Sequence, residues 1–236
     1  KSAYQLSLVF YDSMLTDVTS KERMDEVSSK GYAYGYIGSC IPFVASLVLV
    51  LMYDSFGISM NTAMMLAFIL IALWWIILTI PLFKSYKQVN YVDTAQTKGT
   101  WHRLIGIFRE LKKDKQILLF LIAFFFFIDG VYTIIDMATA YGTALGFDTT
   151  SLLLALLLTQ IVAFPAAIFF GKMSHKYPNY KLLYICIVAY LCIALYAITL
   201  AEQYQFWVLA FFVGLFQGAI QSLSRSYFAK LIPAEK

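Results

Sequence analysis

The chain has 236 residues, of which 61% are hydrophobic and 14% charged, and its formal net charge at pH 7 is +4. Soluble domains carry about a quarter charged residues, so this composition excludes a soluble globular domain and predicts an integral membrane protein. The basic residues lie between hydrophobic runs instead of forming one patch, so no nucleic-acid partner is expected.

The hydrophobic runs predict one partial and six complete membrane spans, each complete one near the roughly twenty residues that a bilayer requires. Residues 3–18 are interpreted as the last turns of a helix whose start is missing, followed by a polar stretch at 19–30. The complete spans are expected at residues 33–53, 62–83, 117–140, 150–171, 182–201 and 206–223. We therefore expect an all-α, polytopic membrane helix bundle and a fragment of a longer protein, incomplete at both ends.

Lysines and arginines fall only in alternate connections between these spans, apart from Lys1. They occupy the polar stretch after the partial helix, the long middle segment, the connection at 172–181 and the tail from Arg225. The intervening connections at 54–61, 141–149 and 202–205 contain acids but no basic residue. The positive-inside rule therefore places the basic connections in the cytoplasm.

The middle segment contains its own periodic pattern. Apolar residues recur there at spacings of three and four, opposite basic ones: Trp101, Leu104, Ile105, Phe108 and Leu111 against His102, Arg103, Arg109, Lys112 and Lys113. This pattern predicts a basic amphipathic helix on the cytoplasmic membrane surface. It is either a plain linker helix or a site for a regulatory partner.

Asp129 lies about twelve residues into the run 117–140, after eleven residues without a polar side chain. At about 1.5 Å per residue its carboxylate lies about 18 Å deep in a hydrocarbon layer about 30 Å thick. An isolated Asp at such depth costs at least about 2.5–3.5 kcal/mol, so we expect it to face a water-filled cavity, a partner or a substrate. Asp136 lies on the same helix face as Asp129, and Tyr132 lies near that face. Asp136 is close to the outer end of the span, so it is expected to be solvated. Asp129 is therefore a candidate functional residue, with a structural pair as the alternative.

Three amides lie deep in later apolar runs, namely Gln160, Gln217 and Gln221. The last two are four residues apart and share a helix face. Such amides seek partners inside a bundle, so they either contact substrate or join helices by hydrogen bonds. Tyr11, Tyr132 and the kink-prone Pro165 complete the expected lining of the cavity.

The sequence contains no arrangement typical of an enzyme. Cys40, Cys186 and Cys192 lie in apolar runs without metal-ligand spacing, and His102 and His175 lie in separate segments. There is no phosphate-binding loop and no nucleophile elbow. We expect no catalytic residue, no metal and no cofactor.

Four stretches resemble the vacuole-effluxer-like (autophagy-related amino-acid effluxer) branch of the major facilitator superfamily. They are residues 10–38, IDGVYTII at 128–135, ALLLTQIVAFP at 155–165 and GAIQSLSRSYFAKLIP at 218–233. The resemblance implies twelve spans in two pseudo-symmetric halves, of which this chain contains the end of span 4 and spans 5 to 10. Residues 1–83 would end the first half, 84–116 form the cytoplasmic middle loop, and 117–236 begin the second half.

The resemblance also implies a function. It implies a secondary transporter that exports small solutes, neutral amino acids in particular, by alternating access, with proton coupling as an open option. The location would be a bacterial inner membrane, or a vacuolar membrane if the source is eukaryotic. The alternative is a non-transporting membrane receptor or scaffold on the same bundle, for which Asp129→Asn would leave activity intact and no solute flux would depend on the protein.

An internal alignment pairs charges of opposite sign. Residues 13–23 align without gaps onto 226–236, which places Asp12 and Asp17 opposite Arg225 and Lys230. We hypothesise that these groups help to close a cytoplasmic gate through ion pairs. Separate contacts with lipid headgroups and loops are the alternative.

Residues 171–181, GKMSHKYPNYK, match the cytoplasmic loop motif of the superfamily, whose usual form is Gly-x-Leu-Ala-Asp-Arg-x-Gly. Gly171 permits close helix packing, and Lys176 replaces the arginine. His175 occupies the acidic position, and a neutral histidine cannot anchor a cation or a helix N-terminus as an aspartate does. His175 is therefore either a proton sensor at the gate or a solvated loop residue.

Overall fold

The structure is a computed structural model that describes residues 2–89, 106 and 114–232, and all regular structure in these residues is helical. Six of its helices are long and apolar enough to cross a membrane, which confirms the all-α multi-pass bundle. The predicted amphipathic helix at 101–113 lies almost wholly outside the described residues. The elements are α1 (Ser2–Ser13), α2 (Leu15–Val18), the 3-10 turn η1 (Lys21–Arg23), α3 (Met24–Leu51), α4 (Met60–Ser85), α6 (Lys115–Ala144), α7 (Thr149–Met173), α8 (Asn179–Ile198) and α9 (Gln203–Leu231).

All six long helices begin before their predicted spans, and all but α3 and α8 also end beyond them. The stretch at 19–30 was predicted to be a polar connection, but α3 already begins at Met24. Helix α9 continues to Leu231, two turns past the predicted limit at 223. Hydropathy detects only the segment that lies in hydrocarbon, whereas these added turns are polar and pack against one another.

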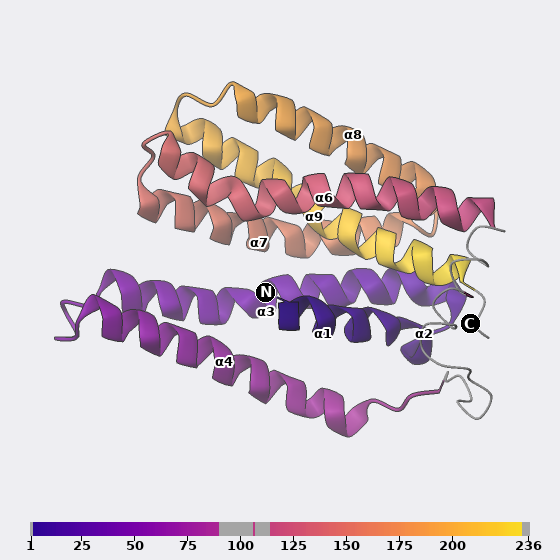
Figure 1. Cartoon of the computed structure of the whole chain (residues 1–236), viewed down its shortest axis with the longest axis horizontal. Helices are drawn as coiled ribbons and strands as arrows, with labels where there is room; N and C mark the ends of the chain where they lie inside the picture. Colours follow the sequence, from indigo (N-terminus) through magenta and orange to yellow (C-terminus); the bar gives the residue numbers. More distant parts are fainter. Residues whose placement is uncertain (1, 90–105, 107–113, 233–236) are drawn as a thin grey trace.

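Successive helices alternate in direction, so the start of α3, the end of α7 and the end of α9 meet at one end of the bundle (Figure 1). We call this the basic end. Leu15, Met24 and Ala229 form a small apolar cluster there. The described lysines and arginines gather at this end, as the loop pattern predicts: Lys21, Arg23, Lys30, Lys84, Lys87, Lys115, Lys172, Lys176, Lys181, Arg225 and Lys230.

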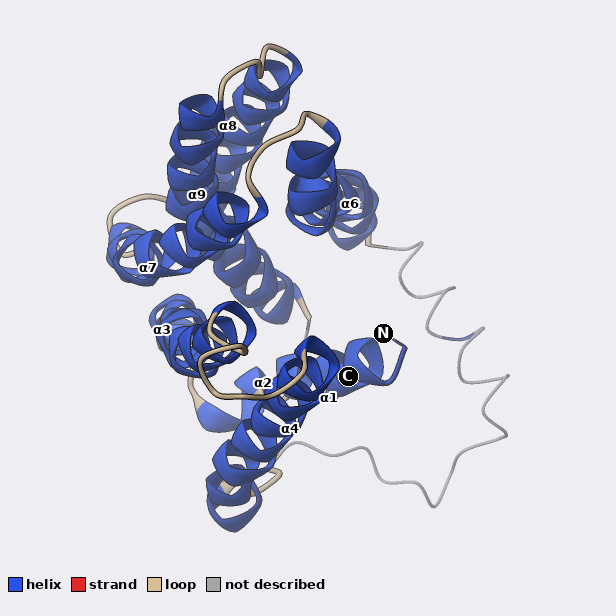
Figure 2. Cartoon of the chain, turned by 90° about the vertical axis from the view of Figure 1, so that its left-hand side faces the viewer, coloured by secondary structure: helices blue, strands red, loops and turns tan. Residues whose placement is uncertain are grey.

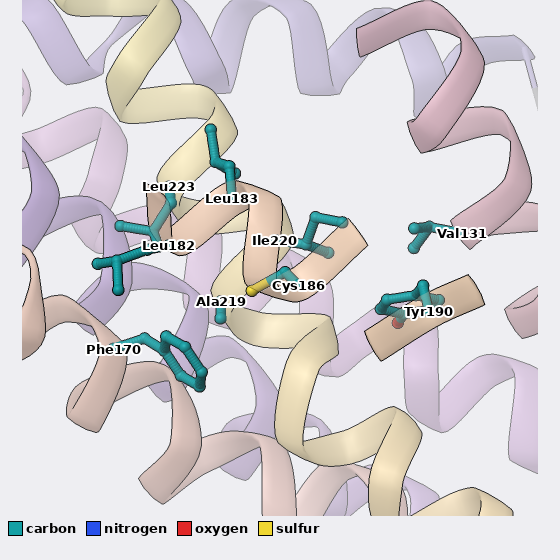
Figure 3. Close-up of a cluster of buried hydrophobic side chains, with 9 residues drawn as sticks. All are labelled: Val131, Phe170, Leu182, Leu183, Cys186, Tyr190, Ala219, Ile220 and Leu223. Carbon is teal, nitrogen blue, oxygen red and sulfur yellow. The ribbon is translucent and has the colours of Figure 1, made fainter. Parts of the chain in front are cut away.

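Helix α9 is the most buried of the six long helices and occupies the middle of the second helix group, α6–α9. One of two large apolar clusters in this group joins α9 to α6, α7 and α8 (Figure 3). Its buried residues are Val131, Phe170, Leu182, Leu183, Cys186, Tyr190, Ala219, Ile220 and Leu223. Most side chains of α4 and α6 are exposed, as expected for apolar helices in a membrane.

Helix α3 belongs to the first helix group, α1–α4, and joins it to the second group. It packs against α4 on one side and against α7 and α9 on the other (Figure 2). Glycines let these backbones approach closely. A Cβ on Gly171 of α7 would lie 2.5 Å from the Cβ of Ser29 in α3. A Cβ on Gly218 of α9 would lie 2.9 Å from the Cβ of Ala167 and 3.0 Å from the ring of Tyr36. The α3 interface with α7 and α9 is therefore tight from the basic end to the middle of the bundle.

Candidate functional site

Arg225 joins three helices at the basic end. Its Nη1 lies 3.3 Å from Oδ1 of Asp12 at the end of α1, the pair that the internal alignment placed together. Its Nε donates a hydrogen bond of 3.0 Å to Oγ of Ser28 in α3, and its Nη2 donates one of 3.2 Å to the Ser28 carbonyl. The guanidinium therefore connects the last turns of α9 to α1 and to the first turns of α3.

Two tyrosine rings enclose the same guanidinium. The Arg225 Cζ lies 5.0 Å from the ring centre of Tyr11 and 4.7 Å from that of Tyr32. Cation–π contacts of this kind strengthen when the cation is shielded from water, as Arg225 is here. The structure thus places Tyr11 with the gate candidates at the basic end and beside Arg225.

Lys230 pairs with a residue that the sequence did not single out. Its Nζ lies 2.5 Å from Oδ2 of Asp25 in the first turn of α3. Oδ1 of Asp25 accepts a hydrogen bond of 2.6 Å from Nδ2 of Asn179, the first residue of α8. The alignment had placed Lys230 opposite Asp17. In the structure the start of α3 reaches Lys230 as a helix, and Asp25 is its ion-pair partner.

Asp17 holds the segment that follows α4. It accepts hydrogen bonds from the hydroxyl of Tyr86 and from the backbone N–H of Val89. The bond to the carboxylate raises the pKa of the Tyr86 hydroxyl, because it stabilises the protonated phenol. Asp17 therefore connects the exit of α4 to the short helix α2.

The three candidate residues at the end of α7 and in the loop after it differ in burial. Gly171 is buried against Ser29 and permits the close approach of α7 to α3. His175 and Lys176 are exposed in the turn between α7 and α8. Gly171 thus belongs to the interface between helix groups, and the other two lie at its edge.

A second polar group lies deeper in the bundle, and we call it the central polar cluster: Tyr36, Gln217 and Gln221. The Tyr36 hydroxyl donates a hydrogen bond of 2.6 Å to Oε1 of Gln221. Gln217, one turn earlier on α9, is buried and interacts with the same hydroxyl. The cluster joins α3 to α9 without a charged group.

Gln160 and Gln217 both line a small pocket of about 50 Å³ between α6, α7 and α9. The remaining lining is largely apolar, and the Gln160 Oε1 is buried without a hydrogen-bond partner among the described residues. Pro165 lies further along α7 and lines an apolar groove with Phe211 and Phe216. Asp129 lies outside both lining sets.

Asp129 and Asp136 are exposed on one face of α6, opposite the buried Val131. Tyr132 lies near this face and is close enough to Tyr32 and Tyr36 of α3 to interact with them electrostatically. The structure therefore turns this side of α6 toward α3. What Asp129 binds stays a prediction.

Sequence reasoning missed the α3 contributions to both polar groups, which come from Asp25, Ser28, Tyr32 and Tyr36. The pair Gln217 and Gln221 indicated that some partner faced α9, but it did not indicate which helix carried it. In the part of the chain that the structure describes, no three His, Cys, Asp or Glu side chains gather as a metal site.

Three comparisons relate the chain to known proteins. The family described as "Vacuole effluxer Atg22 like" matches residues 5–236. The uncharacterised MFS-type transporter YxiO of Bacillus subtilis is 42% identical over 229 residues, which cover 95% of this chain and 54% of YxiO. The autophagy-related protein 22 of Coccidioides immitis is 27% identical over 238 residues, which cover 88% of this chain and 39% of that protein. The chain thus spans about half or less of the length of these relatives, and no solved structure matches it.

Proposed function

Because the chain belongs to the vacuole effluxer Atg22-like family, which consists of transporters and not enzymes, we propose that the protein is a secondary transporter of small solutes. It is an integral membrane protein with several spans. Transport would proceed by alternating access, in which two helix groups rock around a site between them. Residues 1–83 and 117–236 would supply parts of the two groups, and residues 84–116 would connect them.

The observation that carries this proposal is the contact of α3 with α9. Polar side chains join these helices at two depths, at the basic end and nearer the middle of the bundle. At the basic end Arg225 bonds to Ser28 and Asp12, and deeper in the bundle Tyr36 bonds to Gln221. A transporter needs a contact that closes one side and a site that binds solute nearer the midplane. In this proposal the Arg225 contacts would close the basic end, and the Tyr36–Gln221 contact would belong to the solute site.

The proposed gate consists of residues at the basic end: Asp12, Asp17, Gly171, His175, Lys176, Arg225 and Lys230. Hydrogen bonds and ion pairs here join side chains of both helix groups. Such contacts must break when the groups separate and must form again when they close. Because the positive-inside rule predicts that the basic end is cytoplasmic, the gate would close the cytoplasmic side.

The proposed substrate site consists of the central polar cluster with Gln160, Tyr132, Asp129 and, toward the gate, Tyr11. Amide and phenol groups can both donate and accept, so they suit the ammonium and carboxylate groups of a neutral amino acid. Asp129 would bind the substrate ammonium or take up a coupling proton. We propose amino acids as the substrate on this basis, and efflux as the direction because the family is described as vacuole effluxer-like.

A flux assay of the full-length protein in liposomes tests the proposal, using a panel of neutral amino acids with and without an imposed pH gradient. We expect uptake or counterflow of at least one amino acid, and its reduction in Tyr36→Phe. Flux that requires the pH gradient would support proton coupling. If no solute moves while the protein is folded, the receptor or scaffold alternative takes its place.

A further inference from the structure

Two neighbouring acids at the start of α3 have different surroundings. Glu26 pairs within its own region of the chain, with Lys30 at 2.6 Å and Arg23 at 3.8 Å. The Asp25 side chain is 5% exposed, and the partners of its carboxylate come from α8 and α9 of the other helix group. Adjacent residues project about 100° apart on a helix, and of the two only Asp25 has its hydrogen bond and ion pair with α8 and α9.

Both oxygens of Asp25 are occupied. Asn179 donates to Oδ1 at 2.6 Å, and Lys230 approaches Oδ2 at 2.5 Å. Asn179 is buried and begins α8, whereas Lys230 lies in the last turn of α9, where the helix dipole favours a cation. A buried carboxylate is tolerated only with such partners, so the three residues form one unit.

The loop between α7 and α8 lacks the acid that its motif normally carries. His175 occupies that position and is exposed, and residues 174–178 contain no Asp or Glu. The same loop ends at Asn179, which bonds to Asp25. The acid at this junction therefore comes from α3 and reaches the loop from the opposite helix group.

We propose that Asp25 is a second lock of the basic end, distinct from the Arg225–Asp12 pair, and that it replaces the missing loop acid. It holds the start of α3 to the start of α8 and the end of α9 while the basic end is closed. Separation of the helix groups must expose Asp25 to water and release Lys230. This role rests on the proposed alternating-access function, since it matters only if the basic end opens.

The test measures opening directly, in the full-length protein without substrate or gradient. Ser222 is fully buried in α9, where Ser28 and Ser29 of α3 bond to it. In a background without native cysteines, Ser222→Cys becomes a reporter for a membrane-impermeant maleimide applied from the basic side. Asp25→Asn and Lys230→Met are each expected to raise its labelling rate about tenfold or more. Lys230→Met leaves the buried Asp25 carboxylate without its cation, and Asp25→Asn removes the charge that holds Lys230.

Glu26→Gln is the matched control, an adjacent acid with partners on its own side, and its labelling rate should equal that of the parent. The double variant Asp25→Asn/Lys230→Met should label more slowly than Lys230→Met alone, because it removes both charges together. If Asp25→Asn does not fold, Lys230→Met and the double variant decide the matter. Equal rates for Lys230→Met, the double variant and Glu26→Gln would overturn the lock.

The outcome separates the two proposals. Faster labelling in the variants without any amino-acid flux in liposomes would leave the lock standing and remove the transport function. Flux in the parent with unchanged labelling in Asp25→Asn would remove the lock and leave the transport function.

Discussion

Arg225 and Asp12 lie 213 positions apart in the chain, and Nη1 of the first lies 3.3 Å from Oδ1 of the second. The two side chains differ in exposure, 8% for Arg225 and 44% for Asp12. A partly exposed ion pair contributes only about 0–1 kcal/mol. Arg225 has further partners in Ser28 and two tyrosine rings, so the two ends of the pair are not equivalent.

We therefore predict that Arg225→Gln destabilises the closed basic end more than Asp12→Asn. The first change removes the bonds to Ser28 and the cation–π contacts and costs at least about 2 kcal/mol, whereas the second costs at most about 1 kcal/mol. Thermal unfolding of the purified full-length protein and labelling of Ser222→Cys both report the difference. Equal losses in the two variants would mean that the Asp12 pair alone holds Arg225.

Exchange of the two charges gives a separate prediction. Asp12→Arg combined with Arg225→Asp should recover part of the flux lost in the single variants, because opposite charges again face each other. Recovery should be incomplete, since a shorter, anionic aspartate at 225 cannot replace the bonds of Arg225 to Ser28 or its cation–π contacts with the two tyrosine rings. Liposome flux of the two single variants and the double variant measures this, and no recovery at all would count against the ion pair.

The number and order of the long helices could be predicted from the sequence, because hydrophobic length alone identifies a membrane span. The Arg225–Asp12 pair could be predicted as well, since the internal alignment brings equivalent helix ends together. The polar first turns of α3 could not, because Asp25 and Glu26 look alike in a sequence. Their different burial depends on which residue faces α8 and α9, and only tertiary packing decides that.

For the central polar cluster, the sequence predicted the glutamines of α9 but not their partner on α3. Gln217 and Gln221 are four residues apart, and this spacing predicts a polar face on α9. Their partner Tyr36 is one of 17 tyrosines, and no feature of the sequence distinguishes it from the others. Which tyrosine meets α9 depends on the close approach of α3 at Gly218, where a Cβ would lie 3.0 Å from the Tyr36 ring.

Gly171→Ala should open the interface of α3 with α7 at the basic end. Its Cβ would lie 2.5 Å from Cβ and 2.8 Å from Oγ of Ser29, so the two helices must separate. Overpacking of this kind costs about 1–3 kcal/mol, and we expect faster labelling of Ser222→Cys together with lower thermal stability.

The chain offers both a control and a rescue for this change. Gly35→Ala places a Cβ in α3 that meets no atom of the described residues within 4 Å, so it should be neutral or slightly stabilising. Ser29→Gly combined with Gly171→Ala removes the opposing Cβ and should restore slow labelling. A double variant that labels as fast as Gly171→Ala would show that the steric explanation is wrong.

Two tyrosine substitutions of the same kind should have opposite outcomes. Tyr36→Phe removes the donor to Gln221 and should cost about 1 kcal/mol and reduce flux. The Tyr190 hydroxyl is buried and has no hydrogen-bond partner among the described residues, so Tyr190→Phe should be neutral or stabilising. Chemical unfolding and liposome flux of both variants test this, and equal behaviour would remove the special role of Tyr36.

Asp129→Asn tests the acid on α6. The side chain is exposed in the described chain, so stability should change little while gradient-driven flux falls about tenfold or more. Asp136→Asn, two turns further on the same face, is the matched control and should retain flux. If Asp129 takes up a coupling proton, its variant keeps amino-acid counterflow and loses only the response to the pH gradient. If Asp129 binds the substrate ammonium, counterflow is lost as well, and a variant that retains both activities would show that this carboxylate is not the working group.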